Sequence, residues 1–244
     1  MKHKCNCHKG LDFNIAMAFQ PIMDWRTKSV FAYEALVRGE QGEGAAVVLA
    51  KVTEGNKYSF DQTCRVQAIK SISQLDASAR VSINFMPNAI YNPNTCIART
   101  LEAADKYGVN KERIIFEVVE SEQPVSNDFL NEIFQAYRNM GFTTAIDDFG
   151  AGYAGLNLLV DMRPDIIKID RHLVDRIDLQ PRKATIVRHL VLMLKELGIT
   201  VLAEGIERRQ EYEFLRDNGV DLMQGYYFAK PALESLPIVS EVCW

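Results

Sequence analysis

The sequence lacks the features that mark membrane, secreted and duplex-binding proteins. Its longest aliphatic run, Ala45 to Ala50, is far shorter than the roughly 20 apolar residues of a membrane helix. The first ten residues, MKHKCNCHKG, are basic, but no apolar segment of the kind found in signal peptides follows them. There is no basic run, and the formal net charge of −4 argues against binding of duplex nucleic acid. We therefore expect a cytoplasmic protein without a membrane span.

The cysteines do not form a recognisable disulfide pattern. The five cysteines are Cys5, Cys7, Cys64, Cys96 and Cys243. Their odd number and irregular spacing argue against a disulfide framework. The segment HKCNCH offers His3, Cys5, Cys7 and His8 as soft ligands, but at a spacing that is not a standard zinc pattern. We expect residues 1–14 to form a flexible leader and residues 15–244 to form one domain.

Eight apolar or β-branched runs alternate with helical patterns along the chain. The runs span residues 15–23, 29–37, 79–85, 113–120, 142–149, 165–170, 200–205 and 221–228. Helical spacing is clear from Ile186 to Leu197, with Gly198 as a stop, and from Leu130 to Tyr137. The first two runs adjoin and could form a hairpin, whereas the later strand–helix alternation predicts a mainly parallel sheet. Eight strands in about 220 residues favour an α/β fold of the (β/α)8 barrel type over an open sheet.

Polar residues lie where these runs end. Strand ends carry Glu34, Asn84, Glu117, Asp147, Asp148, Lys168, Glu204 and Gln224. The active sites of barrels lie at the carboxyl ends of the strands. A single acid there is more often a loop cap, but five carboxylates in one mouth repel one another and one lysine cannot neutralise them. Either several are protonated or divalent cations lie among them, and the all-oxygen ligand set favours Mg²⁺ or Mn²⁺ over zinc.

The stretch IDDFGAGYAG, residues 146–155, places two aspartates side by side. Neighbouring residues of a strand normally point to opposite faces. We expect Asp147 to point inward from the end of its strand and Asp148 to be the first loop residue, where the following glycines let the chain turn. The two carboxylates could then reach two metals about 4 Å apart. The alternative is an Asp-Gly turn that caps a following helix.

Eight motifs resemble those of the EAL-domain family, in the order of that family, over residues 15–235. They are FQPIMDW, YEALVRG, SINFMP, IIFEVVE, AIDDFGAGYAGL, DIIKIDRHLV, VLAEGIE and MQGYYFAKP. Members of this family hydrolyse the bacterial second messenger cyclic diguanylate (c-di-GMP) to linear pGpG. They use Mg²⁺ or Mn²⁺, and Ca²⁺ inhibits them. The resemblance implies a modified TIM barrel with an antiparallel first strand, a homodimer, and control by a regulatory protein partner.

The resemblance also implies two metal ions in one active site. The ligands of the first metal would be Glu34, Asn84, Glu117 and Asp147. Asp147 and Asp148 would bind the second metal, and Glu204 would bind a metal or its water. Glu34 would lie next to the substrate as well.

The remaining roles implied by the resemblance are catalytic or substrate-binding. Lys168 would orient the attacking water and help to deprotonate it, and Gln224 would position water. Gln20 and Arg38 would contact the substrate, with Arg38 at a phosphate. Glu120 would hold the loop that follows DDFG.

The loop itself departs from the family pattern, DDFGTGYSSL. Ala151, Ala154 and Gly155 replace three hydroxyl residues in a loop that couples metal binding to dimerisation in relatives. We expect an active enzyme in which this coupling is weaker.

Two alternatives are a receptor that binds c-di-GMP without cleaving it and acts through partners, and a scaffold that acts through apolar residues such as Val242 and Trp244. Complete metal ligands and the lysine favour the enzyme. The sequence leaves open whether the chain is a stand-alone protein or a fragment.

Overall fold

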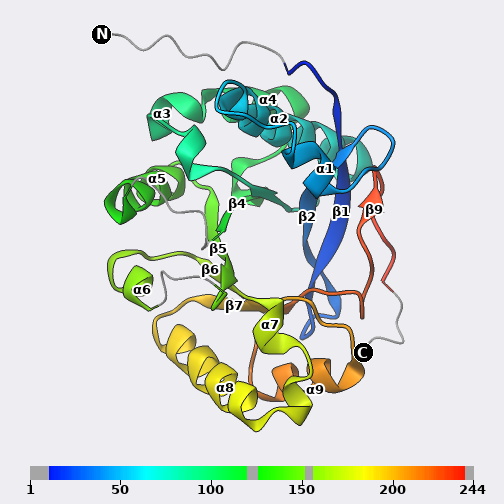
Figure 1. Cartoon of the computed structure of the whole chain (residues 1–244), viewed down its shortest axis with the longest axis vertical. Helices are drawn as coiled ribbons and strands as arrows, with labels where there is room; N and C mark the ends of the chain where they lie inside the picture. The colour runs from blue at the N-terminus through cyan, green and yellow to red at the C-terminus, as the bar shows by residue number, and fades with distance from the viewer. Residues whose placement is uncertain (1–10, 120–125, 152–155, 240–244) are drawn as a thin grey trace.

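Nine strands form one sheet in the part of the chain that the computed structural model describes, residues 11–119, 126–151 and 156–239 (Figure 1). The strand order is β2-β3-β4-β5-β6-β7-β8-β1-β9, and the additional pairing of β1 with β2 closes the first eight strands into a barrel. β1 is antiparallel to its neighbours β2 and β8, whereas β2 to β8 pair in parallel. The predicted barrel and its antiparallel first hairpin are confirmed.

The strands agree with the predicted runs except at the C-terminal end. They are β1 (Ile15–Asp24), β2 (Ser29–Gly39), β3 (Val81–Asn84), β4 (Ile114–Val119), β5 (Thr143–Phe149), β6 (Ile166–Ile169), β7 (Thr200–Ala203), β8 (Leu222–Met223) and β9 (Ala232–Leu233). The predicted strand 221–228 is wrong beyond Met223. The second half of this predicted strand, which holds the aromatic residues, forms a turn instead. In this turn Phe228 N donates to Gly225 O, and Tyr227 N donates to Ile206 O.

Helices cover the outside of the barrel. They are α1 (Ala45–Leu49), α2 (Lys57–Asp76), α3 (Pro93–Cys96), α4 (Ala98–Tyr107), α5 (Asn127–Asn139), α6 (Asn157–Asp161), α7 (Arg171–Val174), α8 (Pro181–Glu196) and α9 (Arg209–Asp217), with 3-10 turns η2 (Pro87–Ala89), η3 (Lys111–Arg113) and η4 (Ile177–Leu179). In Figure 1, α2 and α4 lie side by side at the top, and α8 and α9 lie at the bottom.

The predicted helix at residues 186–197 is α8. It begins with Pro181 in its first turn, and Gly198 follows its end with a φ of +73°. Proline suits the first helical turn because its missing N–H has no partner there, and glycine suits the left-handed position after the last turn. No helix in the described ranges is long and apolar enough to cross a membrane.

An apolar layer supports a polar layer inside the barrel. The apolar layer is a separate buried cluster: Ile22, Ala32, Ile115, Ala145, Ile166, Leu202 and Leu222. Side chains two positions apart on a strand point to the same face. The residues two positions closer to the end of the barrel where the parallel strands have their carboxyl ends therefore also point inward. Those residues are Gln20, Glu34, Glu117, Asp147, Lys168, Glu204 and Gln224. The apolar layer therefore closes the barrel beneath the polar groups.

The turn after β8 brings Gly225 against the backbone of Ile206. A Cβ on Gly225 would lie 2.0 Å from Ile206 O and 2.3 Å from Ile206 N. Both obstacles are backbone atoms that cannot rotate away. We expect Gly225→Ala to lower the free energy of unfolding by about 1–3 kcal/mol, as overpacking does. Urea denaturation of the wild type and the variant would measure this difference in the free energy of unfolding.

Gly55→Ala is the matched control, because its Cβ would meet only Thr53 Oγ1, at 3.7 Å. We expect its stability to stay within about 0.5 kcal/mol of the wild type. Equal stability of the two variants would contradict the tight approach at Gly225.

Candidate active site

A β-bulge brings Asp147 and Asp148 to the same site. In the parallel pairing of β5 with β6, Ile146 pairs with Ile167 and Phe149 with Ile169, so both aspartates lie opposite Lys168. Two residues opposite one define a bulge. Asp148 also has a φ of +54°, in the left-handed region that aspartate tolerates better than most residues. The expectation that Asp148 is the first loop residue is wrong: it lies within β5, and the bulge releases it from strand alternation.

The carboxylates form two groups that share one member. Glu34, Glu117 and Asp147 each offer an oxygen, and these oxygens lie within 4.8 Å of one another. Oxygens of Asp147, Asp148 and Glu204 do the same. Carboxylate oxygens are the ligands that Mg²⁺ and Mn²⁺ prefer. Each group could therefore hold a divalent cation, and Asp147 belongs to both groups.

Lys168 lies at the centre of the cluster. Its side chain is fully buried, and its Nζ lies 2.7 Å from Glu204, 2.9 Å from Glu117, 3.1 Å from Asp147 and 3.7 Å from Glu34. Burial lowers the pKa of Lys168, but the carboxylates outweigh it and hold this pKa well above its usual range. In the absence of other cations, Lys168 therefore stays protonated and carries a positive charge.

One lysine does not balance the carboxylates around it. Burial raises the pKa of Glu117 to about 8, against the attraction of Lys168 and with further repulsion from Glu34 and Asp147. Burial and the charge of Asp147 raise the pKa of Asp148 to about 6. The pKa of Glu204 is likewise raised by burial, despite Lys168. Without metal the site retains protons, and divalent cations would displace them.

Amide side chains join the carboxylates to neighbouring strands. Gln224 Nε2 donates to Glu34 Oε2 at 2.7 Å and to Gln20 Oε1 at 3.3 Å. Asn84 Nδ2 donates to Glu34 Oε1 at 3.1 Å, so its amide oxygen is the candidate metal ligand. Gln224 Oε1 is buried and has no hydrogen-bond partner within the described part of the chain. That oxygen is available to accept a hydrogen bond from water or substrate.

Sequence reasoning missed Ser82, which is fully buried and whose hydroxyl donates to Glu117 Oε1. Its signal was present, because Ser82 lies two residues before Asn84 on the same face of β3.

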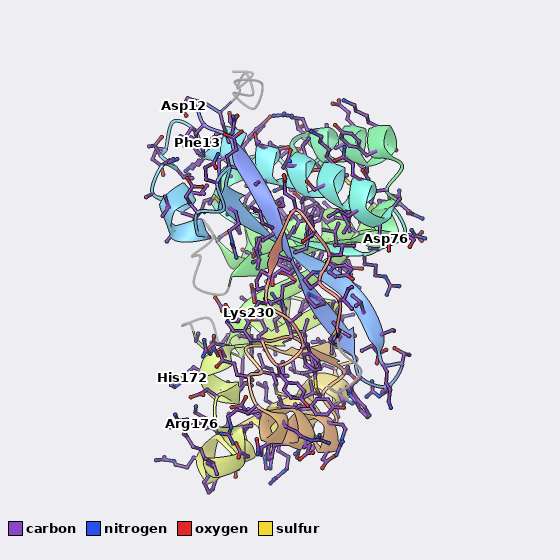
Figure 2. All side chains as sticks on the ribbon, turned by 90° about the vertical axis from the view of Figure 1, so that its right-hand side faces the viewer. Asp12, Phe13, Asp76, His172, Arg176 and Lys230 are labelled. Atoms are coloured by element: carbon purple, nitrogen blue, oxygen red, sulfur yellow. The ribbon has the colours of Figure 1, made fainter. Side chains whose placement is uncertain are left out.

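Arg38 lies outside the carboxylate cluster. It is half-buried, and its Nη1 donates to the carbonyl of Val37 at 2.8 Å. Asp170 caps the N-terminus of α7, where its Oδ1 accepts from His172 N at 2.8 Å. His172 and His189 are both exposed, and Figure 2 shows His172 at the outer edge of the molecule.

Some predicted residues lie outside the described residues. These are His3, Cys5, Cys7, His8, Glu120, Ala154, Gly155, Val242 and Trp244. Ala151, the first of the altered loop positions, is exposed in the turn after β5.

The fold and the site define a β/α barrel protein with an acidic centre suited to divalent cations. The EAL domain family model matches residues 10–231, and the chain belongs to this family.

The most informative similarity is to a standalone versatile EAL protein from Vibrio cholerae O395, solved in a c-di-GMP bound form. The two are 47% identical with a TM-score of 0.93, over 96% of this chain and 99% of that one. BlrP1 from Klebsiella pneumoniae, solved with manganese and c-di-GMP at pH 6, is 32% identical with a TM-score of 0.87, over 95% of this chain and 59% of BlrP1.

Curated relatives are more distant and longer. The probable cyclic di-GMP phosphodiesterase PdeG of Escherichia coli is 29% identical over 222 residues, which are 87% of this chain and 44% of PdeG. The blue light- and temperature-regulated antirepressor BluF of Escherichia coli is 28% identical over 236 residues, which are 96% of this chain and 59% of BluF. The chain thus spans about half the length of these relatives.

The raised pKa of Glu117 predicts how pH affects stability. The native metal-free protein keeps a proton on Glu117 up to a pKa of about 8, whereas the unfolded chain releases it near the ordinary value of 4.5. Because the native state binds more protons in this window, the free energy of unfolding should fall as pH rises from 5 to 8.

Urea denaturation in a chelator at pH 5, 6, 7 and 8 would measure this slope. Glu117→Gln should make this slope less steep but not flat, because the raised pKa values of Asp148 and Glu204 act in the same direction. Glu102→Gln, at an exposed position of α4, should leave the slope unchanged. An unchanged slope in Glu117→Gln would contradict the assignment.

Proposed function

We propose that this protein is a metal-dependent phosphodiesterase that hydrolyses one phosphodiester bond of c-di-GMP to give linear pGpG. The observation that carries the proposal is the pair of carboxylate groups that share Asp147. Membership in the EAL domain family, and the c-di-GMP bound to the Vibrio cholerae structure, support this substrate. The name of PdeG and the manganese in BlrP1 support the reaction and the cofactor.

Residues of both groups would hold Mg²⁺ or Mn²⁺. The first set is Glu34, Asn84, Glu117 and Asp147, and the second is Asp147, Asp148 and Glu204. The chemistry that two bound cations supply is a lowered pKa of water and stabilisation of charge on the phosphoryl oxygens. The apolar layer below the site keeps bulk water from entering through the barrel.

Side chains beside the carboxylates would complete the reaction. Lys168 Nζ would accept the proton of the attacking water once cations offset the carboxylates that now hold its pKa high. Gln224 Oε1, buried and unpartnered among the described residues, would orient that water. Gln20 would contact the nucleotide, and the Arg38 guanidinium would exchange the carbonyl of Val37 for a phosphate oxygen, which matches its planar fork.

We further propose a cytoplasmic homodimer in which residues 15–244 act as one domain and a protein partner regulates activity. Two apolar side chains of the segment that follows the altered loop support self-association. Leu156 is 58% exposed and Val160 of α6 is 82% exposed.

Product analysis tests the activity. The purified protein would be incubated with c-di-GMP and Mg²⁺ or Mn²⁺, and the nucleotides separated by chromatography. We expect pGpG, and we expect its loss both in Glu34→Ala and on addition of a chelator. Saturable binding of c-di-GMP without any product would contradict the enzyme and identify a receptor.

A variant of Lys168 tests the proton-transfer step. We expect Lys168→Met to lower kcat by about 10²- to 10⁴-fold, the usual contribution of a general base, while Mn²⁺ binding persists. Lys106→Met, at an exposed position of α4, should keep wild-type kcat. A Lys168→Met enzyme with near-normal kcat and bound Mn²⁺ would exclude this role.

A further inference from the structure

A buried ion pair lies on the outer side of the barrel, behind β3 and β4. Arg65 and Asp61, one turn apart on α2, are 0% and 2% exposed, and Arg65 Nη2 lies 2.8 Å from Asp61 Oδ2. No role in the proposed chemistry requires them. Charged residues are rarely buried this completely unless they are paired, and apolar residues of similar volume would often be as stable.

The second oxygen of Asp61 holds the backbone beside a candidate metal ligand. Met86 N donates to Asp61 Oδ1 at 2.9 Å, and Met86 follows Asn84 by two residues. The intervening Phe85 N donates to the carbonyl of Glu117 at 2.9 Å. Both amides after Asn84 are therefore fixed, one by the strand that carries Glu117 and the other by Asp61.

Arg65 fixes Asp61 and contacts the neighbours of two candidate ligands. Its guanidinium carbon lies 5.2 Å from the ring centroid of Phe116 and 5.4 Å from that of Phe85, and its Nη1 donates to the hydroxyl of Tyr137 at 3.0 Å. Phe85 follows Asn84, and Phe116 precedes Glu117. Because strand side chains alternate, the two rings lie on the outer face while the candidate ligands lie on the inner face.

A cavity of about 220 Å³ borders the segment after β3, lined among others by Asp61, Cys64, Asn84, Phe85 and Met86. The ring of Phe85 is buried in the apolar core, where it packs against Phe116 and Tyr137. Met86, the next residue, is half-buried. Packing therefore holds the side chain of Phe85, and the hydrogen bond from Met86 N to Asp61 adds a directional restraint on the backbone that follows it.

We propose that Asp61 is a positioning residue for the metal site, which fixes the segment after β3 and thereby Asn84, while Arg65 holds Asp61 in place. This inference rests on the proposed metal binding at Glu34, Asn84, Glu117 and Asp147. Groups that orient metal ligands from outside the coordination sphere typically change metal affinity 10- to 100-fold when they are removed.

Two double variants isolate the hydrogen bond from the ion pair. Asp61→Leu with Arg65→Met, and Asp61→Asn with Arg65→Met, both remove the buried charges, so neither leaves an unpaired ion. Only the asparagine keeps an acceptor for Met86 N. Calorimetric titration with Mn²⁺, thermal unfolding, and hydrogen exchange of the Met86 amide in metal-free protein would be measured for each, with Asn84→Ala as a reference for loss of the ligand.

We expect the leucine variant to bind Mn²⁺ about 10-fold or more weakly and to exchange the Met86 amide faster. We expect the asparagine variant to match the wild type in both measurements. Equal Mn²⁺ affinity in the two variants, or a loss that only follows a lowered unfolding temperature, would overturn the positioning role. A wild-type protein that binds Mn²⁺ but yields no pGpG would contradict the proposed activity and leave this comparison intact.

Discussion

The mutual repulsion of five carboxylates around one buried lysine is the constraint on which this structure depends. Lys168 lies within 4 Å of Glu34, Glu117, Asp147 and Glu204, yet the pKa values of Glu117 and Asp148 remain raised to about 8 and about 6. Desolvated like charges at these distances cannot all ionise without additional positive charge. The carboxylates that repel one another in the metal-free protein are therefore also the groups that could bind divalent cations.

The barrel holds these charges together by supporting them from two sides. Inside, the apolar layer closes the barrel below them, the amides of Asn84 and Gln224 donate to Glu34, and Gln224 also donates to Gln20 on β1. Outside, the Arg65–Asp61 pair links α2 and α5 to the backs of β3 and β4. A preorganised ligand set of this kind avoids reorganisation when cations bind.

Much of this architecture follows from the sequence, because local patterns specify it. Apolar and β-branched runs predicted β1 to β7, and the closeness of the first two runs predicted the antiparallel hairpin. The rule that parallel strands bring their carboxyl ends together predicted that distant acids such as Glu34 and Glu204 would meet. The family motifs matched the EAL domain, which covers residues 10–231.

The sequence by itself determined where β1 to β7 lie, the barrel class and the acids at the strand ends, since apolar runs and the residues that follow them can be read along the chain. Only the tertiary structure decided three features. The left-handed φ of Asp148 comes from the bulge against β6, the turn after Met223 comes from hydrogen bonds to Ile206, and the burial of Asp61 and Arg65 comes from packing of α2 on β3. Each depends on a contact between segments far apart in sequence, which no local pattern encodes.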